Sequence, residues 1–257
     1  MNRILASARI EFIIALRNRW VTISVGMMML FSLVLSAAGS APTGALGVDK
    51  LSITVASLTS LAVYLVPLVA LLMSFDAIAG DIERGTLPLV LTYPIARSEL
   101  VLGKFIAHLA ILAIAVAAGY GIAAIAAIAT DPNALVGFPA LVRLFWSSLL
   151  LGATFLGIGY GISAFARRPG AAAGLVIGLW LVLIVLYDLG LLAAIVADDG
   201  GTFTTQYFPW LLLGNPADAF RIYNLAVSDA TSAASGLTGA ANSIPAVHAL
   251  ISILVWP

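Results

Sequence analysis

The chain has 257 residues, of which 62% are hydrophobic and only 9% are charged, and its mean hydropathy is +1.10. A water-soluble domain needs more surface charge, so this composition excludes a soluble protein and predicts one all-α polytopic membrane domain over residues 1–257. A net charge of zero with scattered basic residues argues against nucleic acid as a partner, and the absence of cysteine excludes disulfides and thiolate metal sites on this chain.

Residues 1–19 are predicted to form an amphipathic interfacial helix. Apolar residues recur at helical spacing on one face, while Arg3, Ser7, Arg9 and Arg17 gather on the other. A cleaved signal peptide is not indicated, because no small-residue cleavage site follows a short apolar core. The chain is therefore expected to meet the lipid bilayer from its first helix.

Six apolar segments predict six transmembrane helices, judged against the roughly 20 residues that a spanning helix needs. Their approximate limits are 20–38, 54–76, 99–129, 140–166, 171–197 and 244–257. The last segment is too short to span, so we expect an incomplete sixth helix that the natural chain continues.

The basic residues predict the orientation, because lysine and arginine concentrate on the cytoplasmic side of membrane proteins. With the N-terminus in the cytoplasm, three basic residues lie outside (Lys50, Arg143 and Arg221) and nine lie inside: Arg3, Arg9, Arg17, Arg19, Arg84, Arg97, Lys104, Arg167 and Arg168. We therefore expect a multi-pass protein of the bacterial inner membrane, with residues 76–104 in the cytoplasm and 198–243 in the periplasm.

The cytoplasmic segment 76–104 concentrates charge between two apolar segments. Its charged residues are Asp76, Asp81, Glu83, Arg84, Arg97, Glu99 and Lys104. The sequence LPLVLTY among them is too short to span and is predicted to form a short helix lying on the membrane surface. Thr86 would cap it, Pro88 would fit its first turn and Pro94 would end it. Such a helix suits contact with a soluble partner; an ordinary interfacial loop is the alternative.

The outer segment 198–243 contains PWLLLGNPADAFRIYNL, which is predicted to form a helical ledge in or on the outer membrane interface. Asp218 and Arg221 are three residues apart, so on a helix they share a face and can pair. This ledge is interpreted as a gate or a docking surface, with a solvated ion pair as the alternative. Residues 227–243, rich in Ser, Ala and Gly, predict flexible coil.

Glycines recur at intervals of four in two predicted helices. Gly157 and Gly161 lie in the fourth, and Gly170, Gly174 and Gly178 lie at the start of the fifth. Small residues at this spacing let helix backbones approach closely in a membrane, which predicts tight helix packing and a dimer without identifying its interface.

Catalytic motifs are missing from the sequence. Its two histidines are far apart, and no HExxH, Walker loop or Gly-x-Ser-x-Gly motif is present. Asp188 is the one acid predicted at membrane depth, where it would serve a gate or pathway or make a structural hydrogen bond. A proton relay would need a second carboxylate at that depth, and none is evident. An intramembrane hydrolase using Ser163 is the most remote hypothesis.

The charged cytoplasmic segment resembles the coupling segment of ABC exporter permeases of the second type. The matching residues are Gly80-Asp81-x-Glu83-x-Gly85-Thr86-Leu87, Leu91-Thr92-Tyr93-Pro94, Arg97 and Gly103-Lys104. The similarity is closer to the NosY-type permeases of the nitrous oxide reductase maturation system, since it continues through Asp188-Leu189, Pro209-Trp210-Leu211, Asn215-Pro216, Asp218 and Arg221. Pro88 departs from the expected pattern, which suggests a later start of the coupling helix.

That resemblance implies a homodimeric six-helix permease, each copy seated on a cytoplasmic ABC ATPase subunit. The partner would bind ATP and Mg, so this chain would be a non-catalytic subunit without a metal or other cofactor of its own. The complex would dock a periplasmic β-helical accessory protein and serve copper–sulfur cluster assembly in nitrous oxide reductase during denitrification, by exporting a sulfur species or by driving the partner mechanically. The alternatives are an ABC exporter of another substrate and an ion-coupled secondary transporter using Asp188.

The resemblance also assigns roles to two sets of residues. Those implied for coupling to the ATPase are Asp81, Glu83, Arg84, Gly85, Thr86, Leu87, Leu91, Tyr93, Pro94 and Arg97. Those implied for the periplasmic partner or a gate are Trp210, Asn215, Pro216, Asp218 and Arg221.

Overall fold

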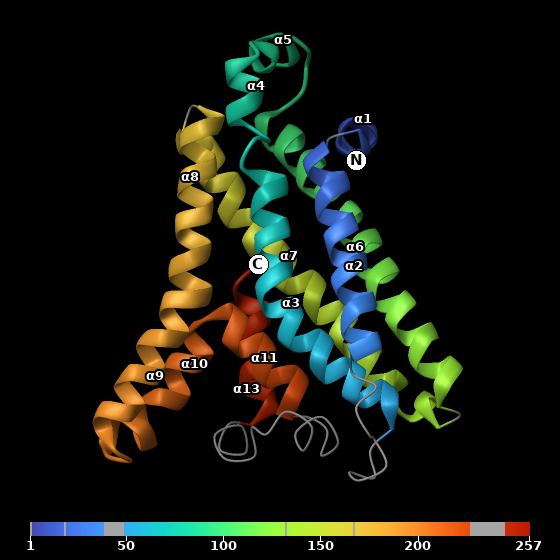
Figure 1. The fold of residues 1–257 in the computed structure, drawn as a ribbon. Coiled ribbons are helices and arrows are strands. Elements are labelled where there is room, and N and C mark those ends of the chain that lie inside the picture. The colour runs from blue at the N-terminus through green and yellow to red at the C-terminus, as the bar shows by residue number, and fades with distance from the viewer. Residues whose placement is uncertain (1, 18, 39–48, 132, 167, 227–244) are drawn as a thin grey trace.

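The computed structural model describes residues 2–17, 19–38, 49–131, 133–166, 168–226 and 245–257, and their regular structure is entirely helical (Figure 1). The first half contains α1 (Asn2–Leu16), α2 (Arg19–Ala38), α3 (Lys50–Ser74), α4 (Ala79–Glu83), α5 (Thr86–Val90) and α6 (Arg97–Thr130). The second half contains η2 (Ala134–Gly137), α7 (Phe138–Ala166), α8 (Pro169–Trp180), η3 (Leu181–Leu186), α9 (Tyr187–Asp198), η4 (Phe203–Tyr207), α10 (Phe208–Gly214), α11 (Pro216–Ala226) and α13 (Ala246–Val255). The all-α prediction is confirmed for these residues; the predicted coil 227–243 lies outside them.

Four helical runs of the described chain are long and apolar enough to span a membrane: Lys50–Glu83, Arg97–Thr130, Ala134–Ala166 and Pro169–Asp198. A fifth is possible if α1 and α2, which meet at a bend of 73°, count as one broken span. The predicted sixth segment, 244–257, contains only the ten-residue helix α13, which is shorter than a bilayer requires. The structure therefore gives four to five candidate spans and does not confirm six.

Helix α3 lies at the centre of the fold and packs against α2, α6, α7 and α11. Apolar side chains such as Leu58, Val66 and Leu71 are fully buried along it. Its buried hydroxyl groups donate back to the helix itself, as Thr59 does to the carbonyl of Val55 at 2.8 Å. A satisfied hydroxyl costs little in an apolar interior, so α3 can carry these polar groups at the centre of the fold.

Close helix contacts in the chain use glycines other than those predicted. A Cβ atom added at Gly103 of α6 would lie 2.6 Å from the Cβ of Ser7, so α1 lies directly on α6 there. By contrast, no described atom outside the local backbone lies within 4 Å of a Cβ added at any of the predicted five: Gly157, Gly161, Gly170, Gly174 and Gly178. These glycines therefore do not pack helices within the described chain. Their use in a dimer stays a prediction.

The segment predicted as a ledge instead packs into the helical bundle. Helix α11 contacts α3, α7 and α13, and its Phe220 is fully buried. Only the preceding residues are open to the surroundings, with Tyr207 and Trp210 59% and 67% exposed. The amphipathic pattern predicted a helix here correctly, but its apolar face is covered by other helices.

Figure 1 shows that α4 and α5 lie at one end of the elongated molecule, near α1 and the start of α8. Helices α9, α10, α11 and α13 gather toward the opposite end. The two segments that carry the predicted site residues are thus separated by the length of the bundle.

Candidate functional site

The charged segment after α3 folds into two short helices joined by a glycine turn. Gly85 has φ = 69°, a left-handed conformation that costs glycine little, and it precedes the first residue of α5. The Thr86 side chain therefore does not cap this helix, contrary to the sequence prediction. Its hydroxyl instead donates toward the carbonyl and carboxylate oxygens of Asp81, at 3.2 and 3.0 Å, and so ties α5 to α4.

Helix α5 is shorter than predicted. Pro88 lies in its first turn, as expected, and does not delay its start, but the helix ends at Val90, four residues before Pro94. The chain then turns through exposed residues and enters α6, where the backbone N–H of Ala96 donates to the Glu99 carboxylate at 2.9 Å. Pro94 therefore marks the turn into α6 rather than the end of the coupling helix.

Ser163 of α7 anchors the start of α4. Its buried hydroxyl oxygen accepts hydrogen bonds from the backbone N–H groups of Ile78 and Ala79, both at 3.0 Å. These donors belong to the turn where α3 passes into α4. The Ser163 hydroxyl therefore has a structural role as an acceptor, and the structure gives no support to the hypothesis that it is a nucleophile.

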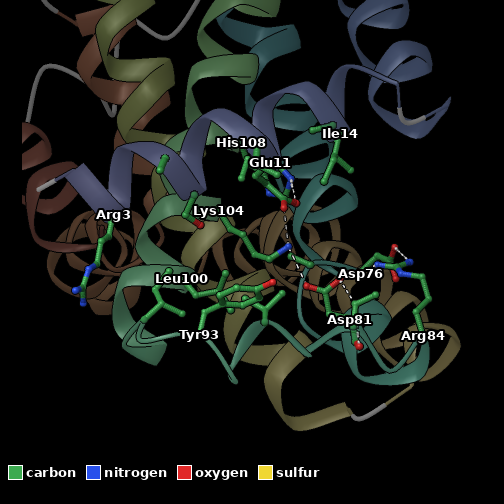
Figure 2. A pocket seen from close by; sticks show the side chains of 18 of the residues that line it. Arg3, Glu11, Ile14, Asp76, Asp81, Arg84, Tyr93, Leu100, Lys104 and His108 are labelled. Atoms are coloured by element: carbon green, nitrogen blue, oxygen red, sulfur yellow. Dashed lines mark hydrogen bonds and ion pairs between the residues drawn. The ribbon is translucent and has the colours of Figure 1, made fainter. Parts of the chain in front are cut away.

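A buried cation joins three helices at this end. The Nζ of Lys104, on α6, lies 2.7 Å from the Oε2 of Glu11 on α1 and 3.0 Å from the Oδ2 of Asp81 on α4 (Figure 2). The side chain of Lys104 is only 8% exposed, so both ion pairs are largely shielded from solvent. Shielded charges must be paired, because an isolated charge in this setting is costly.

The same cluster continues to α7 through His108, one turn further along α6. The His108 Nε2 lies 3.8 Å from the Oε1 of Glu11, and its Nδ1 lies 2.7 Å from the hydroxyl of Tyr160. We call Glu11, Asp81, Lys104, His108 and Tyr160 the Lys104 cluster. It connects α4 to α1, α6 and α7 through side chains that are mostly buried.

Arg84 forms the outer, more exposed side of this arrangement. Its guanidinium lies 3.2 Å from the carboxylates of both Asp76 and Asp81. Partial burial works against its charge, but the hydrogen bonds and charges of these two acids raise the pKa of Arg84. Asp81 is therefore held by a buried cation on one side and an exposed cation on the other.

A cavity of about 780 Å³ separates parts of α1 from α4, α5 and the turn into α6. Figure 2 shows Arg3, Glu11, Asp81, Tyr93 and Lys104 among the side chains around it. The Arg3 guanidinium donates to the carbonyl of Pro94 at 2.6 Å and closes one side. This space lies between α1 and the α4–α5 segment, beside the ion pairs that join these helices.

Several of the predicted coupling residues are exposed between Glu83 and Arg97, a stretch that we call the tip. Glu83 and Arg97 are exposed, Tyr93 is 71% exposed, and the apolar side chain of Leu89 beside them is 66% exposed. Asp81, Thr86, Leu87 and Leu91 are partly buried and support this tip from below. Exposed apolar and charged groups on a small helical tip form a surface suited to another protein.

Sequence reasoning missed the residues beneath the tip, above all Glu11, His108 and Tyr160. One signal was present, because Glu11 is the sole acid in the arginine-rich first helix.

The opposite end contains a second polar cluster. The Arg221 guanidinium on α11 lies 2.8 Å from the carboxylate of Asp188 on α9 and 3.3 Å from that of Asp218. The predicted pairing of Asp218 with Arg221 is therefore present. Asn215 donates its amide N–H to the carbonyl of Leu183 at 2.7 Å, and neighbouring Pro216 begins α11.

Apolar helices with a charged segment at one end define the class as a multi-pass helical membrane protein. Residues 5–257 match the family described as ABC-2 family transporter protein. The chain belongs to this family of permeases, whose members are typically non-catalytic membrane subunits. This membership implies a cytoplasmic ATPase partner.

Two relatives extend over nearly the whole chain. It is 44% identical to a probable ABC transporter permease protein NosY of Pseudomonas aeruginosa over 240 residues, which cover 93% of this chain and 86% of that protein. It is 40% identical to a protein of the same description from Stutzerimonas stutzeri over 260 residues, covering 100% and 94%. The resemblance inferred from the coupling segment is thus confirmed.

Proposed function

We propose that this chain is the membrane subunit of an ATP-driven ABC transporter in which a cytoplasmic ATPase moves the α4–α5 segment. Membership of the ABC-2 family is the observation that carries this proposal. The excess of basic residues at the α1 and α4–α5 end supports an orientation with the N-terminus and this segment in the cytoplasm.

The Lys104 cluster supplies a physical route for the movement. The exposed tip with Glu83, Leu89 and Tyr93 offers the ATPase a contact surface. Displacement of α4 displaces Asp81, which is bonded to Lys104 and through it to Glu11. We therefore expect a push on α4 to reach α1 and α6 together.

We propose further that the complex serves maturation of the copper–sulfide centre of nitrous oxide reductase. The support is the sequence similarity to two permeases named NosY. Two copies of the chain would sit on the ATPase, and the α9–α11 end would dock a periplasmic β-helical protein. The complex would export a sulfur species or transmit force to that partner.

Co-purification with the ATPase tests the coupling role. In Glu83→Arg and Gly85→Leu, hydrolysis stimulated by the membrane subunit should be lost, because the first reverses charge at the contact and the second strains a left-handed position. Asp199→Asn is the control, since it removes the charge of an exposed acid at the opposite end, and asparagine tolerates the left-handed backbone of that residue (φ = 44°). Unchanged hydrolysis in both tip variants would contradict the proposal.

The maturation role has a separate readout. Nitrous oxide reductase purified from cells lacking this chain should have no copper–sulfide centre in its visible absorption spectrum, and re-expression should restore it. A fully assembled centre in such cells would assign the chain to an ABC exporter of another substrate.

A further inference from the structure

Three ionisable side chains meet where α9 contacts α11, far from the Lys104 cluster. Arg221 donates to Asp188 at 2.8 Å and lies 3.3 Å from an oxygen of Asp218. One cation thus faces two carboxyl groups. If all three were ionised, the cluster would carry a net charge of −1.

Asp218 is the group least able to carry that excess charge. Its residue is 1% exposed, and neither carboxyl oxygen accepts a hydrogen bond from the described residues. Asp188 is in a better position, because it holds the short contact to Arg221 and its side chain is 27% exposed. A buried carboxylate without hydrogen bonds pays a large desolvation penalty, which a proton removes.

We propose that Asp218 and Asp188 together form a site that binds a single proton and fastens α11 to α9. The proton resides on Asp218, which donates it to Asp188, while Asp188 continues to accept from Arg221. No other bond forms or breaks. This supplies the second carboxylate that the sequence did not reveal beside Asp188.

The other ionisable groups near the site come from α9, α3, α13 and α7. Tyr187 of α9 lies near both acids and Tyr64 of α3 lies near Arg221, whereas His248 of α13 packs against Trp210. On α7, the charge of Arg143 is influenced by Tyr223, and its buried Nε and Nη2 atoms have no hydrogen-bond partner among the described residues. Burial, opposed by Arg221 and reinforced by Asp188, raises the pKa of Asp218 to about 7.

The proton would act on a junction that is otherwise insensitive to pH. The π-helical segment η3 exposes the carbonyl of Leu183 to the Asn215 amide at 2.7 Å, and the Tyr187 hydroxyl donates to the carbonyl of Leu211 at 2.7 Å. With Asp218 protonated, its hydrogen bond to Asp188 adds to these contacts and to the Arg221–Asp188 ion pair that already joins α11 to α9. Once Asp218 ionises, the two carboxylates repel each other and compete for Arg221, so α11 is held less firmly.

Infrared spectroscopy on the full chain in lipid nanodiscs, with ¹³C-labelled aspartate, tests the proposal. The wild-type protein should show a protonated aspartate carbonyl band at pH 5.5 that is lost by pH 8.5. The band should be absent in Asp218→Asn and retained in Asp199→Asn, an exposed aspartate at the same end. A band that persists in Asp218→Asn, or no titration in this range, would overturn the assignment.

A second variant keeps the test decisive if Asp218→Asn does not fold. In Asp188→Asn, Arg221 has only Asp218 as an acid partner, and an ionised Asp218 is no longer repelled by a second carboxylate. Asp218 should then ionise at lower pH, so the band should have disappeared by pH 7. Titration of the band unchanged from wild type would show that the two acids do not share a proton.

Discussion

Replacing Lys104 with methionine gives the sharpest test of the cluster that joins α4 to the bundle. Lys104 lies 2.7 Å from Glu11 and 3.0 Å from Asp81. At an effective dielectric constant of about 20, each contact represents roughly 6 kcal/mol of Coulomb attraction. Much of this attraction offsets the desolvation of the three charges, so the net loss should be near the 3–5 kcal/mol typical of removing one partner from a buried pair, about 4 kcal/mol.

Thermal unfolding of the full chain in lipid nanodiscs measures this loss, and stimulated ATPase activity of the complex measures its effect on coupling. Glu83→Gln is the control for the unfolding measurement alone, because Glu83 is exposed and its change should cost no more than about 0.5 kcal/mol. The double variant Lys104→Met/Glu11→Gln should recover part of the stability, since it removes one of the stranded carboxylates. If Lys104→Met unfolds at the same temperature as Glu83→Gln, the cluster does not hold these helices together.

Four further outcomes can be checked by thermal unfolding. Gly85→Ala should cost about 1–2 kcal/mol, because the position has φ = 69°; a neutral result would mean that the turn can rearrange. Gly103→Ala should destabilise by about 1–3 kcal/mol through its clash with α1, whereas Gly157→Ala should not, and equal effects would contradict the α1–α6 contact. Ser163→Ala should cost about 1–3 kcal/mol, because two buried N–H groups lose their acceptor; unchanged stability would argue against the anchor. The pKa of Asp218 is raised from 3.8 to about 7, so its proton stabilises the folded state fully below pH 3.8, and this contribution is lost as the pH rises through 7. The melting temperature of the wild-type protein should therefore fall between pH 3.8 and 7, and that of Asp218→Asn should fall less steeply. Parallel melting curves for the two proteins over this pH range would contradict the role of Asp218.

Long apolar runs made the main helices predictable. The expected segments 99–129 and 140–166 agree with α6 (Arg97–Thr130) and α7 (Phe138–Ala166) to within a few residues. Length and hydropathy suffice there, because a helix satisfies its own backbone groups in an apolar setting. The sixth helix predicted over 244–257 is not confirmed, since the described part of that segment contains α13, which is too short to span by itself.

The contacts that build the sites could not be predicted in the same way. Glu11 and Lys104 are 93 residues apart, and Asp188 and Arg221 are 33 residues apart. Neither pair falls on a helical repeat, so local spacing carries no signal for it, unlike the pair Asp218 and Arg221. The Thr86 error has a local cause: an N-terminal cap was assigned from residue type, while the left-handed Gly85 places Thr86 inside the helix.

Helix α3 connects the two ends that these contacts define. It leads into α4 through a four-residue turn, and it packs against α11, which carries Asp218 and Arg221. Its 25 residues span about 37 Å at 1.5 Å per residue, and its side chains are buried along most of that length. A displacement at Asp81 that is carried along α3 would reach the α9–α11 junction. The proton shared by Asp188 and Asp218 would then determine how firmly α11 follows α3 and how firmly it stays with α9, which ties the proposed pH-sensitive contact to the proposed ATP-driven movement.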